Sequence, residues 1–403
     1  MILKREMPKV ALLVDMCCGC GACAAKCPKG CIEMEPDDYG FLHPVINADM
    51  CIGCGGCDGT CPVLNKKLDD KTEEVLWAKS KDNAERMNSS SGGVFALLAR
   101  NVLLSGGMVC GAAWDEDCKR VCHMLVNSSE ELDSIMRSKY VQSSISSEVY
   151  TGMREALSDG KNVLFAGTAC QVAGMRAYLG KLADSDGFLT VDVICHGVPS
   201  PLLWEKWAAH REKCKGAALR AVNMRSKTTS WVSFSSLYSY REEKDTDALT
   251  EESVFSNDWY MKAFLSNVSL RPSCYQCPSK RSCGSDITLG DFWGIQSAHP
   301  EVDYEGGVSA VLCNTPKGVA AIHSIKGSLE WGRSSFEKVL PGNPSLVRSV
   351  APFKNRREFM NDLKSGLSIE KLMNKYDFEP TFGKRLHGKL AGIKSKVGKL
   401  IRH

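Results

Sequence analysis

The chain has 403 residues, which is enough for roughly two or three domains with hydrophobic cores of their own. Its formal net charge of +4 is too small to indicate a nucleic-acid-binding protein, and 43% hydrophobic with 24% charged residues is typical of a globular protein. The sequence shows no signal peptide and no apolar stretch of membrane-spanning length, so we expect a cytoplasmic protein.

Residues 8–15 are expected to form a short strand that leads into two cysteine runs of identical spacing, C-x2-C-x2-C-x3-C-P. This spacing is typical of bacterial ferredoxin domains with two [4Fe–4S] clusters, in which the fourth cysteine of each run binds the other cluster. We therefore predict a first and a second cluster with crossed ligands. The predicted ligands are Cys17, Cys20, Cys23 and Cys61 for the first cluster, and Cys51, Cys54, Cys57 and Cys27 for the second.

Glycines between these cysteines allow the tight turns that point three sulfur atoms at one cluster. Zinc rarely uses this spacing twice over, and disulfides would require export. Cys18 and Cys31 fall outside the ligand pattern and are expected to be packing residues, with the tuning of a cluster as the alternative for either. Cys110 and Cys313 stand alone in apolar strands, which indicates reduced core cysteines and a reducing compartment. Residues 1–64 are thus predicted to form a dicluster ferredoxin domain, followed by a charged linker over 65–74.

A second domain is predicted to begin with a strand over 75–80. The segment 88–107 then predicts a turn rich in serine and glycine, an amphipathic helix, and a stop at a glycine pair. Hydroxyl groups, glycine backbone and a helix N-terminus together suit a phosphate or pyrophosphate, although the serines also fit a plain N-cap. The candidate residues for this anion site are Ser90, Ser91, Gly92 and Gly93.

Two later segments, 161–180 and 187–207, each predict a buried strand, a turn and a helix. Units of this kind favour a parallel sheet with helices on its faces, and ligands bind beyond the carboxyl ends of its strands. Cys170 and Cys195 stand at two such ends, with His196 beside the second, so we expect these three side chains to meet at one site. The alternative is that both cysteines are inert packing residues.

Residues 219–240 alternate polar and apolar side chains and are expected to form antiparallel strands. A C-x2-C pair follows, which by itself permits zinc, a redox dithiol or a cluster. Beside the two strand-end cysteines it permits a third [4Fe–4S] cluster, with Cys283 as the substitute if one strand-end cysteine is not used. The predicted ligands of the third cluster are Cys170, Cys195, Cys274 and Cys277.

The last twenty residues are basic, and apolar side chains recur among them at helical spacing. They predict a basic amphipathic helix over 384–402 that lies on an anionic membrane surface or a partner, or else packs on its own domain with a solvated basic face. The overall prediction is a mixed fold of the α+β or α/β class, with segments at 1–64, 65–160, 161–330 and 331–403.

Five segments stand out together along the chain. They are SSGGVFALLA (Ser90–Ala99), SKYVQS (Ser138–Ser143), GTACQVAGMR (Gly167–Arg176), VDVICHGVPSP (Val191–Pro201), and RPSCYQC with SDITLGDFWGI between residues 271 and 295. Together they resemble the family of coenzyme F420 hydrogenase/dehydrogenase beta subunits, fused here to a two-cluster ferredoxin domain. The resemblance runs from the cysteine runs to about residue 320, and it departs from the family at Ala169, where a proline is frequent.

The resemblance implies an iron–sulfur flavoprotein that binds FAD beside one [4Fe–4S] cluster. His196 would then help to protonate the flavin or substrate, or serve only a structural purpose, and Asp291 would position one of them. These two residues are the candidates for catalysis. The implied FAD contacts are Ser90, Ser91, Gly92, Gly93, Lys139, Tyr140, Gln142, Ser143, Gly167 and Thr168.

The predicted function is that of an oxidoreductase in which single electrons move between the clusters and FAD. FAD would exchange a hydride with F420, a nicotinamide or another organic substrate, so we expect ferredoxin, F420 or NAD(P)H as electron donor or acceptor and no nucleic acid. The alternatives are a non-catalytic dicluster electron-transfer subunit of a larger complex, and a structural or regulatory iron–sulfur protein.

Overall fold

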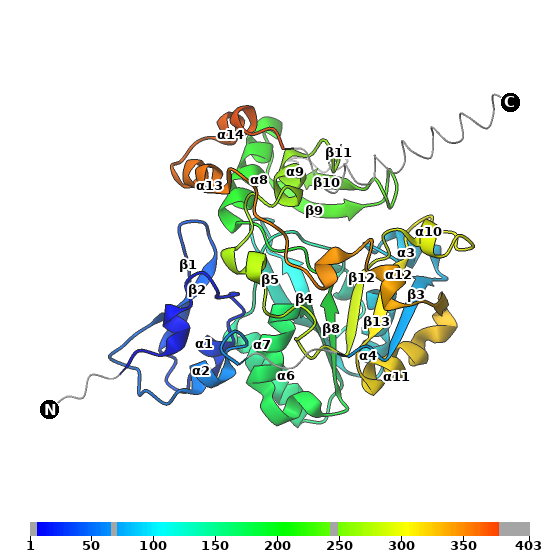
Figure 1. Ribbon diagram of the computed structural model, residues 1–403, viewed down its shortest axis with the longest axis horizontal. Helices are drawn as coiled ribbons and strands as arrows, with labels where there is room; N and C mark the ends of the chain where they lie inside the picture. Colours follow the sequence, from blue (N-terminus) through cyan, green and yellow to red (C-terminus); the bar gives the residue numbers. More distant parts are fainter. Residues whose placement is uncertain (1–5, 66–70, 242–248, 379–403) are drawn as a thin grey trace.

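The computed structural model describes residues 6–65, 71–241 and 249–378 (Figure 1). Its N-terminal domain contains two cysteine loops, each ending in a short helix, with a hairpin between them. Each helix begins after a glycine in the left-handed region, Gly21 with φ of 82° and Gly55 with φ of 70°, a conformation that a side chain disfavours. The elements are the 3-10 helix η1 (Lys9–Leu12), helix α1 (Ala22–Lys26), strands β1 (Ile32–Pro36) and β2 (Leu42–Ile46), and helix α2 (Gly56–Thr60).

The strand predicted over residues 8–15 is wrong, because η1 occupies this position. The N–H groups of Lys9 and Val10 both donate to the Asp58 carboxylate at 3.0 Å. These backbone donors are therefore satisfied without a neighbouring strand, and the contact ties the start of the domain to α2.

A large sheet of nine strands dominates the described part of the chain after residue 70. Strands β12, β8, β7 and β4 run parallel at its centre, while β5 and the strands beyond β12 pair antiparallel. The parallel centre and the mixed α/β class are as predicted. In sheet order the strands are β14 (Leu329–Arg333), β3 (Glu74–Ser80), β13 (Ser309–Cys313), β12 (Ile287–Asp291), β8 (Phe188–Val193), β7 (Val163–Thr168), β4 (Met108–Trp114), β5 (Val121–Val126) and β6 (Ser143–Ser144).

Helices cover both faces of this sheet, because side chains of a buried strand alternate between its two faces. On β7, Leu164 packs with the helices of one face, whereas Val163 and Phe165 pack with those of the other. One face carries α4 (Val94–Leu104), α5 (Leu132–Ile135) and α11 (Pro316–Ile325), and the other carries α6 (Ser147–Ser158), α7 (Ala169–Leu179), α10 (Ile295–Ala298) and α12 (Phe336–Val339).

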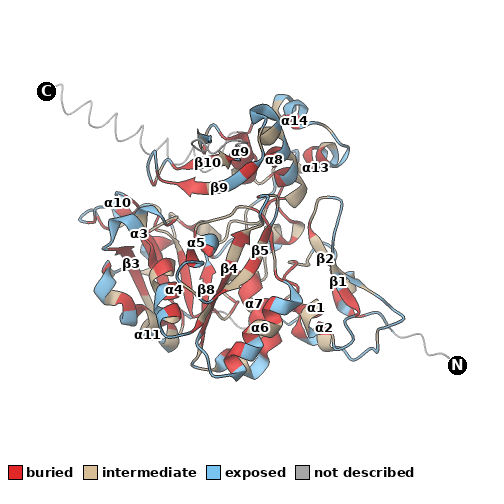
Figure 2. Ribbon diagram, turned by 180° about the vertical axis from the view of Figure 1, so that it is seen from behind, coloured by how far each residue is buried: buried red, intermediate tan, exposed pale blue. Residues whose placement is uncertain are grey.

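A smaller antiparallel sheet lies above the large one in Figure 1, with strands where the alternation over 219–240 predicted them. Helices pack against it around Trp204, Trp207 and Tyr260, which are all buried. Figure 2 shows that buried residues concentrate on the strands and on the helix faces that cover them. The elements are β9 (Leu219–Ser226), β10 (Ser235–Tyr240), β11 (Thr250–Val254), α8 (Pro201–Lys215), α9 (Trp259–Leu265), α13 (Arg356–Lys364) and α14 (Ile369–Lys375).

Residues 65–160 and 161–330 contribute neighbouring strands to the large sheet, since β4 pairs with β7 and β3 pairs with β13. The amphipathic helix predicted over 384–402 lies outside the described residues. Within the described ranges, no helix has the length and apolar character needed to cross a membrane. The remaining short elements are α3 (Asn83–Met87), η2 (Gly180–Asp184), η3 (Pro272–Gln276), η4 (Lys326–Ser328) and η5 (Pro344–Leu346).

Candidate functional site

The predicted ligands of the first cluster come from both cysteine runs. Cys20, Cys23 and Cys61 are buried, and Gly19 N–H donates to Cys17 Sγ at 3.3 Å. Burial, followed by negative charge on Cys17 and Cys61, raises the pKa of Cys23 to about 12. A cysteine of the second run is therefore an electrostatic neighbour of the first run, which agrees with crossed ligands. The ligand assignment itself stays a prediction.

A cavity of about 310 Å³, solvent space at its mouth included, lies at the second cysteine run. Its lining includes Cys51, Cys54 and Cys57 together with Cys27 from the first run. Cys31 also lines it, with its Sγ 3.3 Å from Cys27 Sγ. Cys54 is exposed, so this end of the domain faces solvent. The four predicted ligands of the second cluster thus share one sulfur-lined cavity, and this donor set suits an iron–sulfur cluster.

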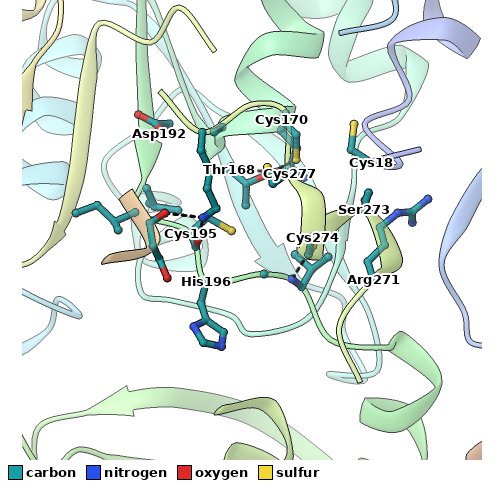
Figure 3. A pocket seen from close by; sticks show the side chains of 18 of the residues that line it. Cys18, Thr168, Cys170, Asp192, Cys195, His196, Arg271, Ser273, Cys274 and Cys277 are labelled. Carbon is teal, nitrogen blue, oxygen red and sulfur yellow. Dashed lines mark hydrogen bonds between the residues drawn. The ribbon is translucent and has the colours of Figure 1, made fainter. Parts of the chain in front are cut away.

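A larger cavity of about 850 Å³, again including solvent space at its mouth, lies at the carboxyl ends of β7 and β8 (Figure 3). We call it the cysteine cavity. Three chain segments meet there: Cys170 lies in the first turn of α7, Cys195 stands two residues after β8, and η3 carries Cys274 and is followed by Cys277. Cys283 is buried beneath α7 instead and does not line the cavity. The predicted third-cluster ligands that line the cavity are Cys170, Cys195, Cys274 and Cys277.

The thiols of the cysteine cavity are partly buried. Burial raises the pKa of Cys195 to about 12, and it raises the pKa of Cys274 and Cys277 as well. The pKa of Cys170 is raised mainly by a hydrogen bond with Cys18. These groups therefore hold their protons until a metal displaces them, and metal binding at the cavity would release protons.

Cationic side chains surround the same thiols. Arg271, Lys280 and Arg281 line the cysteine cavity. Lys280 Nζ donates to the carbonyl of Cys195 at 2.8 Å and to that of Ser345 at 2.5 Å, which fixes its ammonium group beside the sulfur atoms. A cluster held by four thiolates carries negative charge, and nearby positive charge offsets it. The donor set and the charge both fit a [4Fe–4S] cluster.

His196, a candidate for catalysis, lines the cysteine cavity but is already engaged by the protein. Its Nε2 lies 2.5 Å from Asn267 Oδ1, and its ring meets Phe264 edge-on. Burial lowers the pKa of His196 to about 4, so the ring is neutral near pH 7. This arrangement is typical of a structural histidine, and the catalytic role stays a prediction.

Asp291, the other candidate, does not line the cysteine cavity but stands at the end of β12. Its two carboxylate oxygens each lie 2.9 Å from Arg225 Nη2, and Trp231 Nε1 donates to one of them at 2.6 Å. Arg225 Nη2 also donates to the Ser90 carbonyl at 3.3 Å. Asp291 therefore connects the small sheet to the serine–glycine turn through a buried ion pair.

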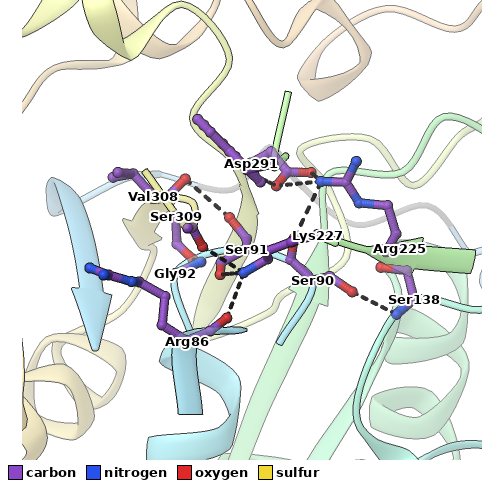
Figure 4. Close-up of polar contacts among 12 residues, drawn as sticks. Arg86, Ser90, Ser91, Gly92, Ser138, Arg225, Lys227, Asp291, Val308 and Ser309 are labelled. Atoms are coloured by element: carbon purple, nitrogen blue, oxygen red, sulfur yellow. Dashed lines mark hydrogen bonds and ion pairs between the residues drawn. The ribbon is translucent and has the colours of Figure 1, made fainter. Parts of the chain in front are cut away.

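The serine–glycine turn, residues 90–93, is tied to its surroundings through several polar groups (Figure 4). Ser90 Oγ accepts the Ser138 N–H at 2.8 Å, and Gly92 N–H donates to Ser309 Oγ at 2.9 Å. The Ser91 hydroxyl donates to the carbonyl that precedes β13 at 3.0 Å. These three groups serve the fold, so a phosphate at this turn would rely on other donors.

Lys227, next to the end of β9, reaches the same turn (Figure 4). It is 5% exposed, and its ammonium group donates to the carbonyls of Arg86 at 2.5 Å, Ser91 at 2.5 Å and Gly306 at 2.7 Å. An ammonium group has three protons, and here each has a carbonyl acceptor. Lys227 thus joins the small sheet, the turn and the segment before β13.

The stretch 139–143 leads from this turn to the cysteine cavity. Ser138 contacts Ser90 at its start, and Gln142 lines the cavity near its end. Lys139 Nζ donates to the Met136 carbonyl at 2.7 Å, and burial lowers its pKa to about 7. The two sites implied by the sequence are therefore connected by one short segment.

The remaining implied FAD residues gather around β7 and the stretch 139–143. Gly167 and Thr168 end β7. Gln171 accepts the Thr168 N–H at 2.9 Å and donates to Ser143 Oγ at 2.8 Å, while Tyr140 stacks on an aromatic ring of α9. Several of these side chains are engaged in packing or capping, and their FAD contacts stay predictions.

Several residues of these sites were not predicted, among them Cys18, Arg271 and Lys227. Cys18, expected to pack or to tune a cluster, lines the cysteine cavity together with Cys170. Arg271 is 1% exposed and donates to the Cys17 carbonyl at 2.6 Å. Lys227 is the third example. The only sequence signal for Cys18 and Arg271 was their position, since Cys18 follows a predicted ligand and Arg271 lies three residues before the C-x2-C pair.

Comparison with known proteins places these features in a family. Residues 160–333 match the family model for the C-terminal part of the coenzyme F420 hydrogenase/dehydrogenase beta subunit, and residues 16–65 match that of the 4Fe–4S dicluster domain. The F subunit of the F(420)H(2) dehydrogenase of Methanosarcina mazei is 27% identical over 189 residues, which are 42% of this chain and 51% of that protein. The chain thus spans about half the length of this curated relative.

Among solved structures, a chain of the F420-reducing [NiFe] hydrogenase complex from Methanosarcina barkeri superimposes with a TM-score of 0.44 and 17% identity, covering 73% of this chain and 91% of that chain. The two family models together include the cysteine runs and the four cysteines of the cysteine cavity. Residues 160–333 thus carry the C-terminal domain of the coenzyme F420 hydrogenase/dehydrogenase beta-subunit family, and residues 16–65 carry a 4Fe–4S dicluster domain.

Proposed function

We propose that this chain is an iron–sulfur flavoprotein oxidoreductase that moves electrons between three [4Fe–4S] clusters and FAD. Its two-electron partner would be F420, a nicotinamide or another organic substrate that gives or accepts a hydride. One observation carries the proposal: four cysteines from three distant segments line one cavity with cationic walls. When bound, a flavin converts single-electron traffic into two-electron hydride chemistry, which clusters alone do not perform.

The residues around the cysteine cavity would hold and tune the third cluster. Thr168 Oγ1 lies 3.2 Å from Cys170 Sγ, and Val198 N–H lies 3.4 Å from Cys274 Sγ. Hydrogen bonds to ligand sulfur stabilise negative charge on the thiolates and raise the reduction potential of a cluster. Lys280 and Arg271 act in the same direction through their positive charge.

FAD is assigned to the surroundings of the serine–glycine turn and the stretch 139–143. Helix α4 begins at the turn, and its 11 residues give the N-terminus a partial positive charge that favours a diphosphate. Arg225 adds a cationic side chain near the same turn. Lys139 and Lys227 add amino groups whose pKa values burial lowers to about 7, so they carry only part of a positive charge near pH 7. Because the stretch ends at the cysteine cavity, residues that would hold FAD reach those that would hold the third cluster.

A second candidate is a non-catalytic electron-transfer subunit of a larger complex. The turn favours it, because the Ser91 hydroxyl and the Gly92 N–H are already bonded within the protein. The M. mazei relative is named as a dehydrogenase subunit, so partner subunits are expected under both candidates.

Anaerobic purification followed by flavin analysis separates the two candidates. The proposal predicts one FAD per chain, and bleaching of the oxidised-flavin absorbance by at least one of reduced F420, NADH or NADPH. Free FAD mixed with the same donors is the control for direct reduction. A chain that carries its full iron content but no flavin would contradict the flavoprotein proposal and favour the electron-transfer subunit.

A further inference from the structure

Cys18 belongs to the ferredoxin domain, yet its side chain lines the cysteine cavity (Figure 3). Cys170 lines the same cavity. Cys17, the residue before Cys18, is a predicted ligand of the first cluster. Cys18 therefore adjoins a predicted ligand of the first cluster and shares a cavity with the predicted ligands of the third.

Several contacts hold this junction in place. Arg271 Nε donates to the Cys17 carbonyl at 2.6 Å, and the Tyr150 hydroxyl donates to the Cys20 carbonyl at 2.8 Å. Gly174 on α7 lets the same loop approach closely, because a Cβ at this position would lie only 2.8 Å from Cys20 Sγ. The loop that carries Cys18 is thus held by three contacts, which keep the Cys18 side chain at the cavity.

The second cluster site faces away from this junction. Cys54 is exposed there, and Met50 and Ile52 beside it are 49% and 46% exposed. The loop of the first cluster, by contrast, packs on α6 and α7. The three sites therefore follow one another from the surface inward, and Cys18 lies at the step between the ferredoxin domain and the large sheet.

We propose that Cys18 is the residue through which single electrons pass between the first and the third cluster. The inference rests on the proposed function, because it requires the third cluster. Each passage moves one electron between the Cys17 side and the Cys170 side, and no bond forms or breaks. A [4Fe–4S] cluster takes four thiolates, and four other cysteines line the cavity. Cys18 is therefore a fifth thiol, which lies at the cluster site without binding iron. Its sulfur is polarizable and stands at the wall of the cavity that would hold the third cluster.

The test uses the full chain with its cofactors, in wild-type form and as Cys18→Ala. Cys313→Ala is the matched control, because Cys313 is a buried cysteine of β13 that does not line the cavity. Light with EDTA as the amine electron donor reduces the bound flavin directly, and rapid freezing followed by electron paramagnetic resonance shows which clusters receive electrons. Iron content and the midpoint potential of each cluster are measured on the same samples.

The expected result is that Cys18→Ala keeps the wild-type iron content and midpoint potentials but loses the fast reduction of the first and second clusters. Cys313→Ala should retain it. Equal transfer in wild type and Cys18→Ala would overturn the inference, and so would a loss of four irons in Cys18→Ala, which would make Cys18 a ligand. A wild-type chain without the third cluster would overturn the inference together with the proposed function, and the iron count identifies that case. Cys18→Ser, which keeps a hydrogen-bonding group, replaces the alanine variant if that variant fails to fold.

Discussion

Replacing Arg271 by methionine is expected to lower the free energy of unfolding by about 3–5 kcal/mol, because buried acceptors would lose their donor. The side chain is 1% exposed. It donates to the Cys17 carbonyl at 2.6 Å, to Gln142 Oε1 at 3.1 Å and to the Leu42 carbonyl at 2.9 Å. Methionine keeps apolar length but has no donor. Anaerobic chemical denaturation followed by circular dichroism measures the loss.

Two of those acceptors lie in the ferredoxin domain, so the variant is also expected to expose that domain to limited proteolysis before the large sheet unfolds. The matched control is Arg120→Met, since the Arg120 side chain is 86% exposed and, within the part of the chain that the structure describes, forms an ion pair only with Asp115. It should change the free energy of unfolding by less than about 0.5 kcal/mol. A wild-type denaturation midpoint for Arg271→Met would contradict the role given to this buried arginine.

Replacing Lys227 by methionine is the second change with a large expected effect. It leaves three carbonyls without their ammonium donor, those of Arg86, Ser91 and Gly306. We expect the free energy of unfolding to fall by about 3 kcal/mol, the scale for removing a buried charged hydrogen-bonding partner. Because Lys227 holds the serine–glycine turn, the purified variant should also retain less flavin per chain than the wild type.

Lys81→Met is the control for this prediction. Lys81 is exposed, and among the described residues its ammonium group donates to one carbonyl, that of Gly327, at 2.8 Å. Its loss should change the free energy of unfolding by less than about 0.5 kcal/mol and leave the flavin content unchanged. If Lys227→Met and Lys81→Met were equally stable and held equal flavin, the turn would not depend on Lys227.

The elements that position the sites were predictable because their signals are local. The strand and helix around Cys170, and the strand before Cys195, follow from short apolar runs and the glycines and serines that end them. Ligands bind at the carboxyl ends of parallel strands, and this rule correctly predicts that the two cysteines meet at one site. The family and the mixed α/β class could be predicted for the same reason, since each motif lies within a short stretch.

Contacts between distant parts of the chain were not predictable. Arg271 and Cys17 are 254 positions apart, and nothing in either local sequence indicates that a carbonyl of the first loop accepts from that guanidinium. Cys18 was expected to be a packing residue because its neighbour fills the ligand pattern. The prediction of a short strand over 8–15 was wrong for a similar reason. The hydrogen bonds from two backbone N–H groups to the Asp58 carboxylate form only in the folded domain.

The most direct test of the central claim is the iron and acid-labile sulfide content per chain after anaerobic purification. Three [4Fe–4S] clusters require about twelve irons and about twelve sulfides, with the third cluster held by the cysteine cavity. About twelve of each is the result that the account predicts. About eight of each would show that the cysteine cavity holds no cluster, and would leave only the dicluster ferredoxin domain as a metal carrier.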